Sequence, residues 1–146
     1  MNTIADLKSE FSIGSSDKIL ALSSLNFDLA VYDIFGFLFA GGEVVIPIPS
    51  CVSPSDPAEM YDLGVSQRVT LWDTVPAFME MLVRLPSFLR LIYMIGDWIP
   101  VTLPPRIIAV SDCPDLQNMS MGGDTEAAVW SNQFILGKEE SGISEG

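Results

Sequence analysis

The stretch Leu22–Gly42, LSSLNFDLAVYDIFGFLFAGG, decides the fold because an apolar strand-like run passes here into an apolar run of helical length. Asp28 lies at the junction, and the helical run ends before Gly41-Gly42, a typical C-terminal stop. A carboxylate in nearly apolar surroundings is costly unless it has a cationic partner, such as a ligand ammonium group. Because Asp is also a common helix N-cap, both roles remain open for Asp28.

Strand-like and helix-like segments alternate along the whole chain. We expect strands at 18–23, 43–47, 68–72, 89–95 and 116–121, and helices at 3–11, 28–40, 54–63, 75–83 and 104–110. Short loops and continuously apolar strands are typical of a parallel sheet that is covered on both faces. The sequence therefore predicts an α/β fold with an open, mostly parallel sheet and helices on both faces.

Composition argues against several classes of function. The chain has 146 residues, enough for one domain with a substantial core, and 49% of them are hydrophobic. Its net charge is −12 and its 7 basic residues are scattered, so we expect no nucleic-acid partner. The absence of histidine excludes Ser-His-Asp and Cys-His nucleophilic systems and most zinc sites.

The sequence gives no sign of a membrane span or a secretory signal. No window reaches the ~18 apolar residues of a membrane-spanning helix, and residues 2–11 read as an amphipathic helix instead of a signal peptide. Cys51 and Cys113 stand far apart without metal-type spacing, which is typical of free thiols in a reducing compartment. We therefore expect a cytoplasmic protein with no membrane partner.

Polar residues follow several of the predicted strands. They are Asp28, Asp73, Gly96-Asp97 and the GGDTE segment 122–126. Open parallel sheets bind ligands outside the carboxyl ends of their strands. Gly122 and Gly123, before a helix start, offer backbone N–H groups to an anion, while Thr125 offers a hydroxyl group to phosphate and Glu126 a carboxylate to Mg²⁺. An ordinary capped helix start remains the alternative interpretation of this segment.

Four motifs occur in an order that resembles the adenylation domains of non-ribosomal peptide synthetases. They are SSLNFDLAVYDIFGFLFAGGEVVIP (23–47), RVTLWDTVPAFMEMLV (68–83), LRLIYMIGDWIP (89–100) and MSMGGDTEAAVWS (119–131). The resemblance covers about residues 2–131. It implies that residues 1–133 are part of the AMP-binding core, the large N-terminal subdomain of an adenylate-forming enzyme. We expect residues 134–146 to be a polar, disordered tail.

The resemblance also implies an activity. Members of this family activate an amino acid with ATP and Mg²⁺ to an aminoacyl adenylate, and then load the acyl group onto the phosphopantetheine thiol of a carrier-protein domain. The implied partners are an amino-acid substrate, the rest of an adenylation domain and a carrier domain. We further expect self-association through exposed apolar surface.

The family's functional positions can be assigned to residues of this chain. The resemblance makes Asp28 the partner of the substrate α-ammonium group. The remaining substrate-binding positions are Leu29, Tyr32, Asp73, Tyr93, Ile95, Met121, Val129 and Trp130. The nucleotide-binding positions are Gly96, Gly122, Gly123, Asp124 and Thr125, and the Mg²⁺ ligand is Glu126.

Ordinary structural roles stand beside several of these assignments. Tyr32, Tyr93 and Trp130 also suit a hydrophobic core, since an aromatic ring packs there and its polar tip finds a partner. Asp73 also suits a surface turn or the cap of the following helix. Asp97-Trp98 also suits a loop whose indole packs against the protein.

Some of the family's catalytic parts are not found in this sequence. It contains no phosphate loop ending in lysine, no downstream Thr-Gly-Asp ribose motif and no match to the lid lysine. Because phosphoryl chemistry relies on positioned cations and donors, we expect this chain alone to be inactive, and whether it is an enzyme stays open. The alternative is a non-catalytic remnant or interaction module with a doubly wound α/β fold. A stand-alone flavodoxin-like domain matches the strand–helix alternation but not the motifs.

Overall fold

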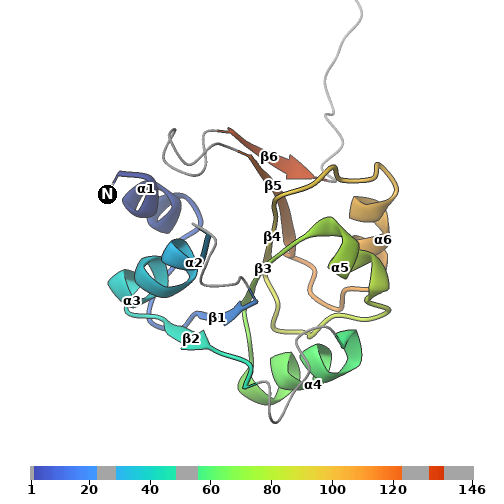
Figure 1. Ribbon diagram of the computed structural model, residues 1–146, viewed down its shortest axis with the longest axis horizontal. Helices are drawn as coiled ribbons and strands as arrows, with labels where there is room; N and C mark the ends of the chain where they lie inside the picture. The colour runs from blue at the N-terminus through green and yellow to red at the C-terminus, as the bar shows by residue number, and fades with distance from the viewer. Residues whose placement is uncertain (1, 23–28, 49–55, 123–131, 137–146) are drawn as a thin grey trace, which may run out of the picture.

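The computed structural model describes residues 2–22, 29–48, 56–122 and 132–136, which form one six-stranded sheet with helices on both sides (Figure 1). The strand order is β2-β1-β3-β4-β5-β6. The strands are β1 Lys18–Ala21, β2 Glu43–Val45, β3 Leu71–Thr74, β4 Leu91–Met94, β5 Gln117–Gly122 and β6 Asn132–Leu136. The first five run parallel and β6 is antiparallel to β5, so the predicted mostly parallel α/β sheet is confirmed.

The helices form two layers, one on each face of the sheet (Figure 1). The first layer contains α1 Asn2–Glu10 and a continuous helical segment made of α2 Leu29–Val31, the π-helix η1 Tyr32–Gly36 and α3 Phe37–Ala40. The second contains α4 Pro57–Gln67, α5 Pro76–Met81 and α6 Leu103–Ala109. Among the described residues, no helix has the length and apolar character needed to cross a membrane.

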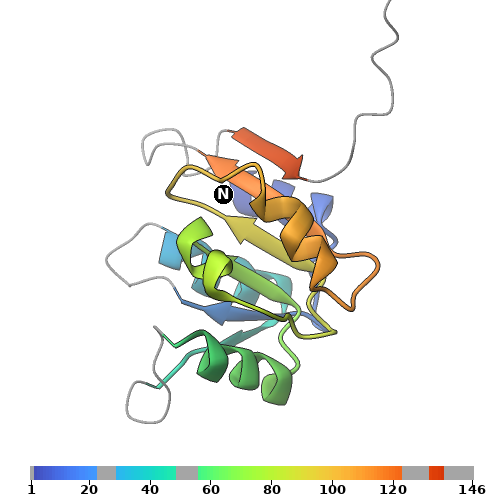
Figure 2. The same cartoon turned by 90° about the vertical axis from the view of Figure 1, so that its right-hand side faces the viewer.

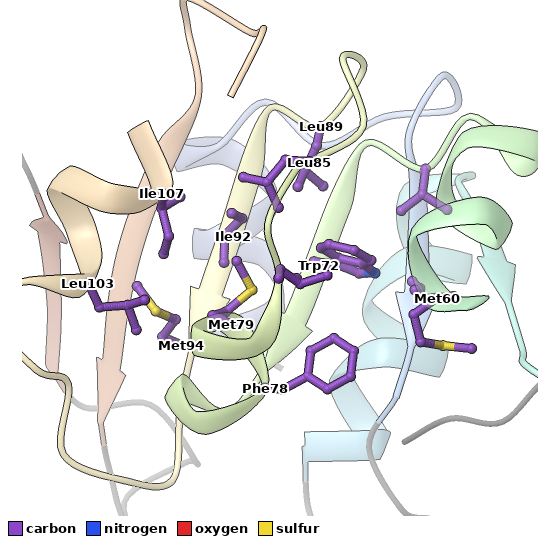
Figure 3. Close-up of a cluster of buried hydrophobic side chains, with 13 residues drawn as sticks. Met60, Trp72, Phe78, Met79, Leu85, Leu89, Ile92, Met94, Leu103 and Ile107 are labelled. Atoms are coloured by element: carbon purple, nitrogen blue, oxygen red, sulfur yellow. The ribbon is translucent and has the colours of Figure 1, made fainter. Parts of the chain in front are cut away.

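Alternation along the strands gives each face its own hydrophobic core, because successive side chains point to opposite faces. Leu71 of β3 belongs to the cluster under α1 and η1, which also contains Phe11 and Phe37. The adjacent Trp72 belongs to the cluster under α4, α5 and α6 (Figure 3). Both faces of the central strands are therefore buried, which explains their continuously apolar sequences.

The boundaries that differ most from those predicted by the sequence are those of α4 and β3. The helix expected at 54–63 begins at Pro57, capped by the Asp56 carboxylate, and continues to Gln67. Arg68 then ends it in the left-handed conformation (φ 56°), so β3 begins at Leu71 instead of Arg68. Periodicity marks the apolar residues but does not show where a helix gives way to a strand.

Strand β6 departs from the expectation for the C-terminal part of the chain. The sequence predicts a polar tail from residue 134, but residues 134–136 belong to β6, where they pair with β5. An edge strand needs a partner on one side only, so a short run of mixed polarity can join a sheet without a recognisable core pattern.

One buried carboxylate, that of Asp17, connects the segments at the amino-terminal ends of the parallel strands. Asp17 precedes β1 and accepts hydrogen bonds from Arg90 Nε at 2.9 Å and Nη2 at 2.8 Å, from Thr70 Oγ1 at 2.9 Å and from the Gly14 N–H at 3.0 Å. Burial by itself would raise the pKa of Asp17, but these hydrogen bonds and the Arg90 charge lower it. Because Arg90 also donates to the Phe11 carbonyl oxygen, this network joins the end of α1 to the starts of β1, β3 and β4.

Candidate functional site

The carboxyl ends of β3 and β4 bring two polar side chains together inside the protein. Asp73 and Tyr93 are paired in register on these adjacent strands, and strand alternation places both on the face covered by α1 and η1. Asp73 is 1% exposed and Tyr93 is fully buried. A carboxyl group and a phenol therefore lie at the edge where open parallel sheets bind ligands.

A second tyrosine meets Tyr93 from the helical layer. The hydroxyl groups of Tyr32 and Tyr93 lie 3.3 Å apart, and the two rings form an edge-to-face contact with centroids 5.9 Å apart. Burial raises the pKa of both tyrosines well above the usual range, so both remain neutral hydrogen-bonding groups. Gly36, one turn after Tyr32, leaves room for this ring, since a Cβ there would lie 2.8 Å from Tyr32 Cδ2.

Asp33 is a further buried acid beside this pair. It follows Tyr32 in η1 and is 1% exposed. Burial, in the first place, and the nearby charge of Asp33 hold the pKa of Asp73 well above its usual range. Two such groups cannot both ionise easily at close range, so the pair keeps a proton at pH values where an exposed Asp is ionised.

Asp33 was not among the substrate-site residues that the sequence suggested. The physical reasoning applied to Asp28 would have found it, because Asp33 also stands inside the apolar run of the opening stretch. Asp73, 40 residues further along the chain, lies close enough to Asp33 for the Asp33 charge to raise the pKa of Asp73. The pairing itself is a tertiary contact with no local sequence signal.

The structure brings part of the predicted substrate site together. The polar groups of Tyr32, Asp73 and Tyr93 lie near one another inside the protein. Ile95 and Met121 belong, with the two tyrosines, to the hydrophobic cluster under α1 and η1. The remaining substrate-site positions have no described side chain: Leu29 begins α2, and Asp28, Val129 and Trp130 lie outside the described residues. The roles of all these residues in substrate binding stay predictions.

The ordinary structural roles considered for Asp73 and for the two tyrosines have different outcomes. Asp73 is buried within β3, which excludes the surface-turn interpretation, and α5 has no side-chain cap. Tyr32 and Tyr93 do pack in a hydrophobic core, as their alternative supposed. What separates them from ordinary core aromatics is their shared hydroxyl contact beside two carboxyl groups.

Of the predicted nucleotide-binding residues, Gly96 is the best described. It lies two residues after the end of β4, is exposed and has a positive φ of 87°. A Cβ there would meet only Val75 Cγ1 at 3.8 Å, so the backbone can be approached closely from this side. Gly122 ends β5, paired with Asn132 of β6.

The predicted anion and metal ligands cannot be placed. Gly123, Asp124, Thr125 and Glu126 lie outside the described residues. Within the described part of the chain, no group of three or more His, Cys, Asp or Glu side chains could hold a metal ion. The Mg²⁺ site therefore rests on Glu126 alone and stays a prediction.

Comparison with known proteins yields consistent similarities. Residues 1–144 match the family model described as "AMP-binding enzyme". The "Anguibactin system regulator" of Vibrio anguillarum is 41% identical over 146 residues, covering 94% of this chain and 14% of that protein. "Pyochelin synthetase PchF" of Pseudomonas aeruginosa is 40% identical over 139 residues, covering 89% of this chain and 7% of that protein.

Solved structures show the same likeness. The nonribosomal peptide synthetase FmoA3 in its α-methyl-L-serine-AMP bound form superimposes with a TM-score of 0.84 at 38% identity. The match covers 93% of this chain and 16% of that one. The AMPPNP-bound form of FmoA3 has a TM-score of 0.82 at the same identity. The chain thus spans a small part of the relatives that it matches.

Proposed function

Because the chain belongs to the AMP-binding enzyme family and corresponds to part of a non-ribosomal peptide synthetase adenylation domain, we propose that this domain activates an amino acid with ATP. The products are an aminoacyl adenylate and pyrophosphate, and the acyl group then passes to the phosphopantetheine thiol of a carrier domain. FmoA3, 38% identical, was solved with AMPPNP and with an aminoacyl-AMP, which supports the use of ATP and an amino acid.

One observation carries this proposal: the buried polar group at the carboxyl ends of β3 and β4. Tyr32, Tyr93, Asp73 and Asp33 place two hydroxyl groups and two carboxyl groups together inside an apolar core. Burying four polar groups costs stability, which a core without a binding role would avoid. Their hydrogen-bonding capacity suits recognition of a small polar ligand such as an amino acid.

The remaining roles follow the family assignment. Asp28 pairs with the substrate α-ammonium group, a charge-assisted contact that gains strength in a partly dry pocket. The open backbone at Gly96 accommodates the nucleotide, and Mg²⁺ bound by Glu126 neutralises phosphate charge when it is present. Nothing in the comparisons points to the non-catalytic alternative.

Amino-acid binding by the full chain tests the proposal. Isothermal titration calorimetry with the common amino acids, one by one, is expected to find one that binds and to show that Asp28→Ala weakens binding at least tenfold. Asp6→Ala, which removes an exposed acid from α1, serves as the matched control and is expected to bind like the original chain. If no amino acid binds to chain shown to be folded by circular dichroism, the proposal is wrong.

The catalytic step has its own test. Amino-acid-dependent ATP–pyrophosphate exchange detects adenylation directly. We expect the chain alone to give none, for want of the family's phosphate-loop and lid lysines. Clear exchange would show that this chain carries the whole reaction without those lysines.

The calorimetry also decides the role of Asp28. Equal amino-acid binding by the original chain and by Asp28→Ala would mean that Asp28 is only a helix cap.

A further inference from the structure

Gly36 is a glycine that its own backbone does not require. It ends η1 and precedes α3 with φ −63° and ψ −45°, which are ordinary right-handed helical values. Most residues favour this conformation more than glycine does, because glycine loses more conformational freedom on folding. Gly41 differs in this respect, since its φ of 81° is a conformation that side chains rarely adopt. The reason for a glycine at position 36 therefore lies in its surroundings.

The ring of Tyr32 occupies the space that a side chain at Gly36 would need. A Cβ there would lie 2.8 Å from Tyr32 Cδ2 and 2.9 Å from Tyr32 Cε2, so one of the two groups would have to move. The Tyr32 ring has little freedom to give way. It is buried, and it packs edge-to-face on both Phe37 and Tyr93, with centroids 5.9 Å apart in each pair. A methyl group at position 36 would therefore push the ring out of this arrangement.

Tyr93, the partner of Tyr32, is held independently from the other side. Its strand β4 pairs with both β3 and β5, and its ring meets Phe11 edge-to-face with centroids 5.6 Å apart. Phe11 is anchored in turn, because its carbonyl oxygen accepts a hydrogen bond from Arg90 Nη1 at 3.0 Å. The place of the Tyr32 ring thus decides whether the two hydroxyl groups meet. Their separation of 3.3 Å is already long for a hydrogen bond between hydroxyl groups, so a small displacement would part them.

We propose that Gly36 is a positioning residue of the amino-acid site: the absence of a side chain there holds the Tyr32 hydroxyl group beside that of Tyr93. Gly36 needs no contact with the substrate, since it acts through the Tyr32 ring. The result is a pair of hydroxyl groups whose geometry is set before the substrate arrives, which lowers the cost of ordering them on binding. This inference rests on the proposed function, because it concerns the same site.

Calorimetry on the full chain, with the amino acid that it binds, tests the role of Gly36. Gly36→Ala is expected to weaken binding about tenfold, the order of one lost hydrogen bond. In a Tyr32→Phe background the same exchange is expected to change affinity less than about twofold, because the hydroxyl group through which it acts is absent. A loss of full size in that background would mean that Gly36 supports the core in general, and would overturn the positioning role.

Gly64→Ala is the matched control. Gly64 is also a buried glycine in a helix, and a Cβ there would lie 3.1 Å from Pro86 Cγ, so the exchange crowds a side chain in the same way. Its helix α4 lies in front of the strands in Figure 2, on the face opposite to the first helical layer that contains η1. Gly64→Ala is therefore expected to bind the amino acid like the original chain.

The geometry of the tyrosine pair has a readout that needs no ligand. In NMR spectra of tyrosine-labelled chain, nuclear Overhauser contacts between the Tyr32 and Tyr93 rings are expected for the original chain and for Gly64→Ala, and are expected to be lost in Gly36→Ala. If Gly36→Ala does not fold, Gly36→Ala/Tyr32→Leu, which lacks the obstructing ring, is expected to fold. Failure of that double variant would overturn the inference.

Two outcomes separate this inference from the proposed function. Ring contacts that persist in Gly36→Ala, or an unchanged amino-acid affinity in that variant, would overturn the positioning role and leave the proposed function standing. A folded original chain that binds no amino acid would overturn the proposed function and, with it, the role of Gly36 in the site.

Discussion

Asp73 illustrates how burial changes the behaviour of a single side chain. In the unfolded chain its carboxyl group ionises with a pKa near the ordinary 3.8, whereas in the folded protein burial and Asp33 raise the pKa well above that value. Between the two pKa values the folded state holds more protons than the unfolded state. Stability therefore falls as the pH rises through this window, and the penalty is absent below about pH 3.8.

Replacing Asp73 by Asn should remove this pH dependence, because the amide has a similar shape and stays neutral. From pH 4 to pH 7 we expect the unfolding free energy of the original chain to fall relative to Asp73→Asn, by at most about 1.4 kcal/mol per pH unit. Urea denaturation at several pH values measures it. Asp62→Asn, at an exposed position of α4, is the control and should leave the slope unchanged. Parallel curves for Asp73→Asn and the original chain would contradict the acid pair.

At the scale of elements, the junction of α3 and β2 depends on close backbone packing. Gly41 ends α3 in the left-handed conformation with φ 81°, as the Gly-Gly pair in the sequence predicts. Gly42 then passes so close to the preceding loop that a Cβ would lie 2.9 Å from the Asp17 carbonyl oxygen. Glu43 can donate its N–H to that same oxygen at 2.9 Å only because the chain comes this near. This contact sets the register of the edge strand β2 beside β1.

Gly42→Ala should therefore destabilise the protein by about 1–3 kcal/mol, since backbone atoms cannot move aside as a flexible side chain can. Chemical denaturation gives the difference in unfolding free energy. Gly14→Ala is the matched control, because a Cβ at Gly14 would meet no atom within 4 Å. Its effect should stay within about 0.5 kcal/mol. Equal losses in the two variants would mean that helix or loop propensity, and not the close approach, determines the cost.

At the scale of the whole molecule, an apolar strip lies on the outer side of the first helical layer. It consists of Val31, Phe35, Leu38 and Phe39, each more than half exposed. Their spacing places them on one side of the α2–η1–α3 segment, while Phe37 points into the core. A contiguous strip of this kind favours contact with other protein surface. The part of FmoA3 that this chain matches is only 16% of that chain. In that relative, the remaining protein offers surface against which such a strip can pack.

We expect the purified chain to self-associate through this strip. Sedimentation velocity at increasing concentration should show oligomers, and the double variant Phe35→Glu/Leu38→Glu should shift the population toward monomer by charge repulsion. Ser87→Glu, at an exposed position in the turn before β4, adds charge elsewhere and serves as the control. A monomeric original chain at all concentrations would contradict the prediction.

Local sequence patterns predicted much of this molecule. The strand–helix alternation, the Gly41 stop and the place of Asp73 at the end of a strand follow from apolar periodicity and turn residues, which act over a few residues. Tyr32 and Tyr93 were singled out by the family resemblance alone. Family resemblance then assigned roles to those positions. Neither the local patterns nor the family resemblance depends on which strands are neighbours in the sheet.

Tertiary structure alone decided the rest. The strand order, the pairing of β6 with β5, the 3.3 Å contact between the Tyr32 and Tyr93 hydroxyl groups and the Asp33–Asp73 acid pair join residues far apart in the chain. Such contacts form only when the strands have assembled into the sheet and the helices have covered it and excluded water. The ionisation of Asp73 and the exposure of Trp98 then depend on surroundings that no stretch of sequence carries by itself.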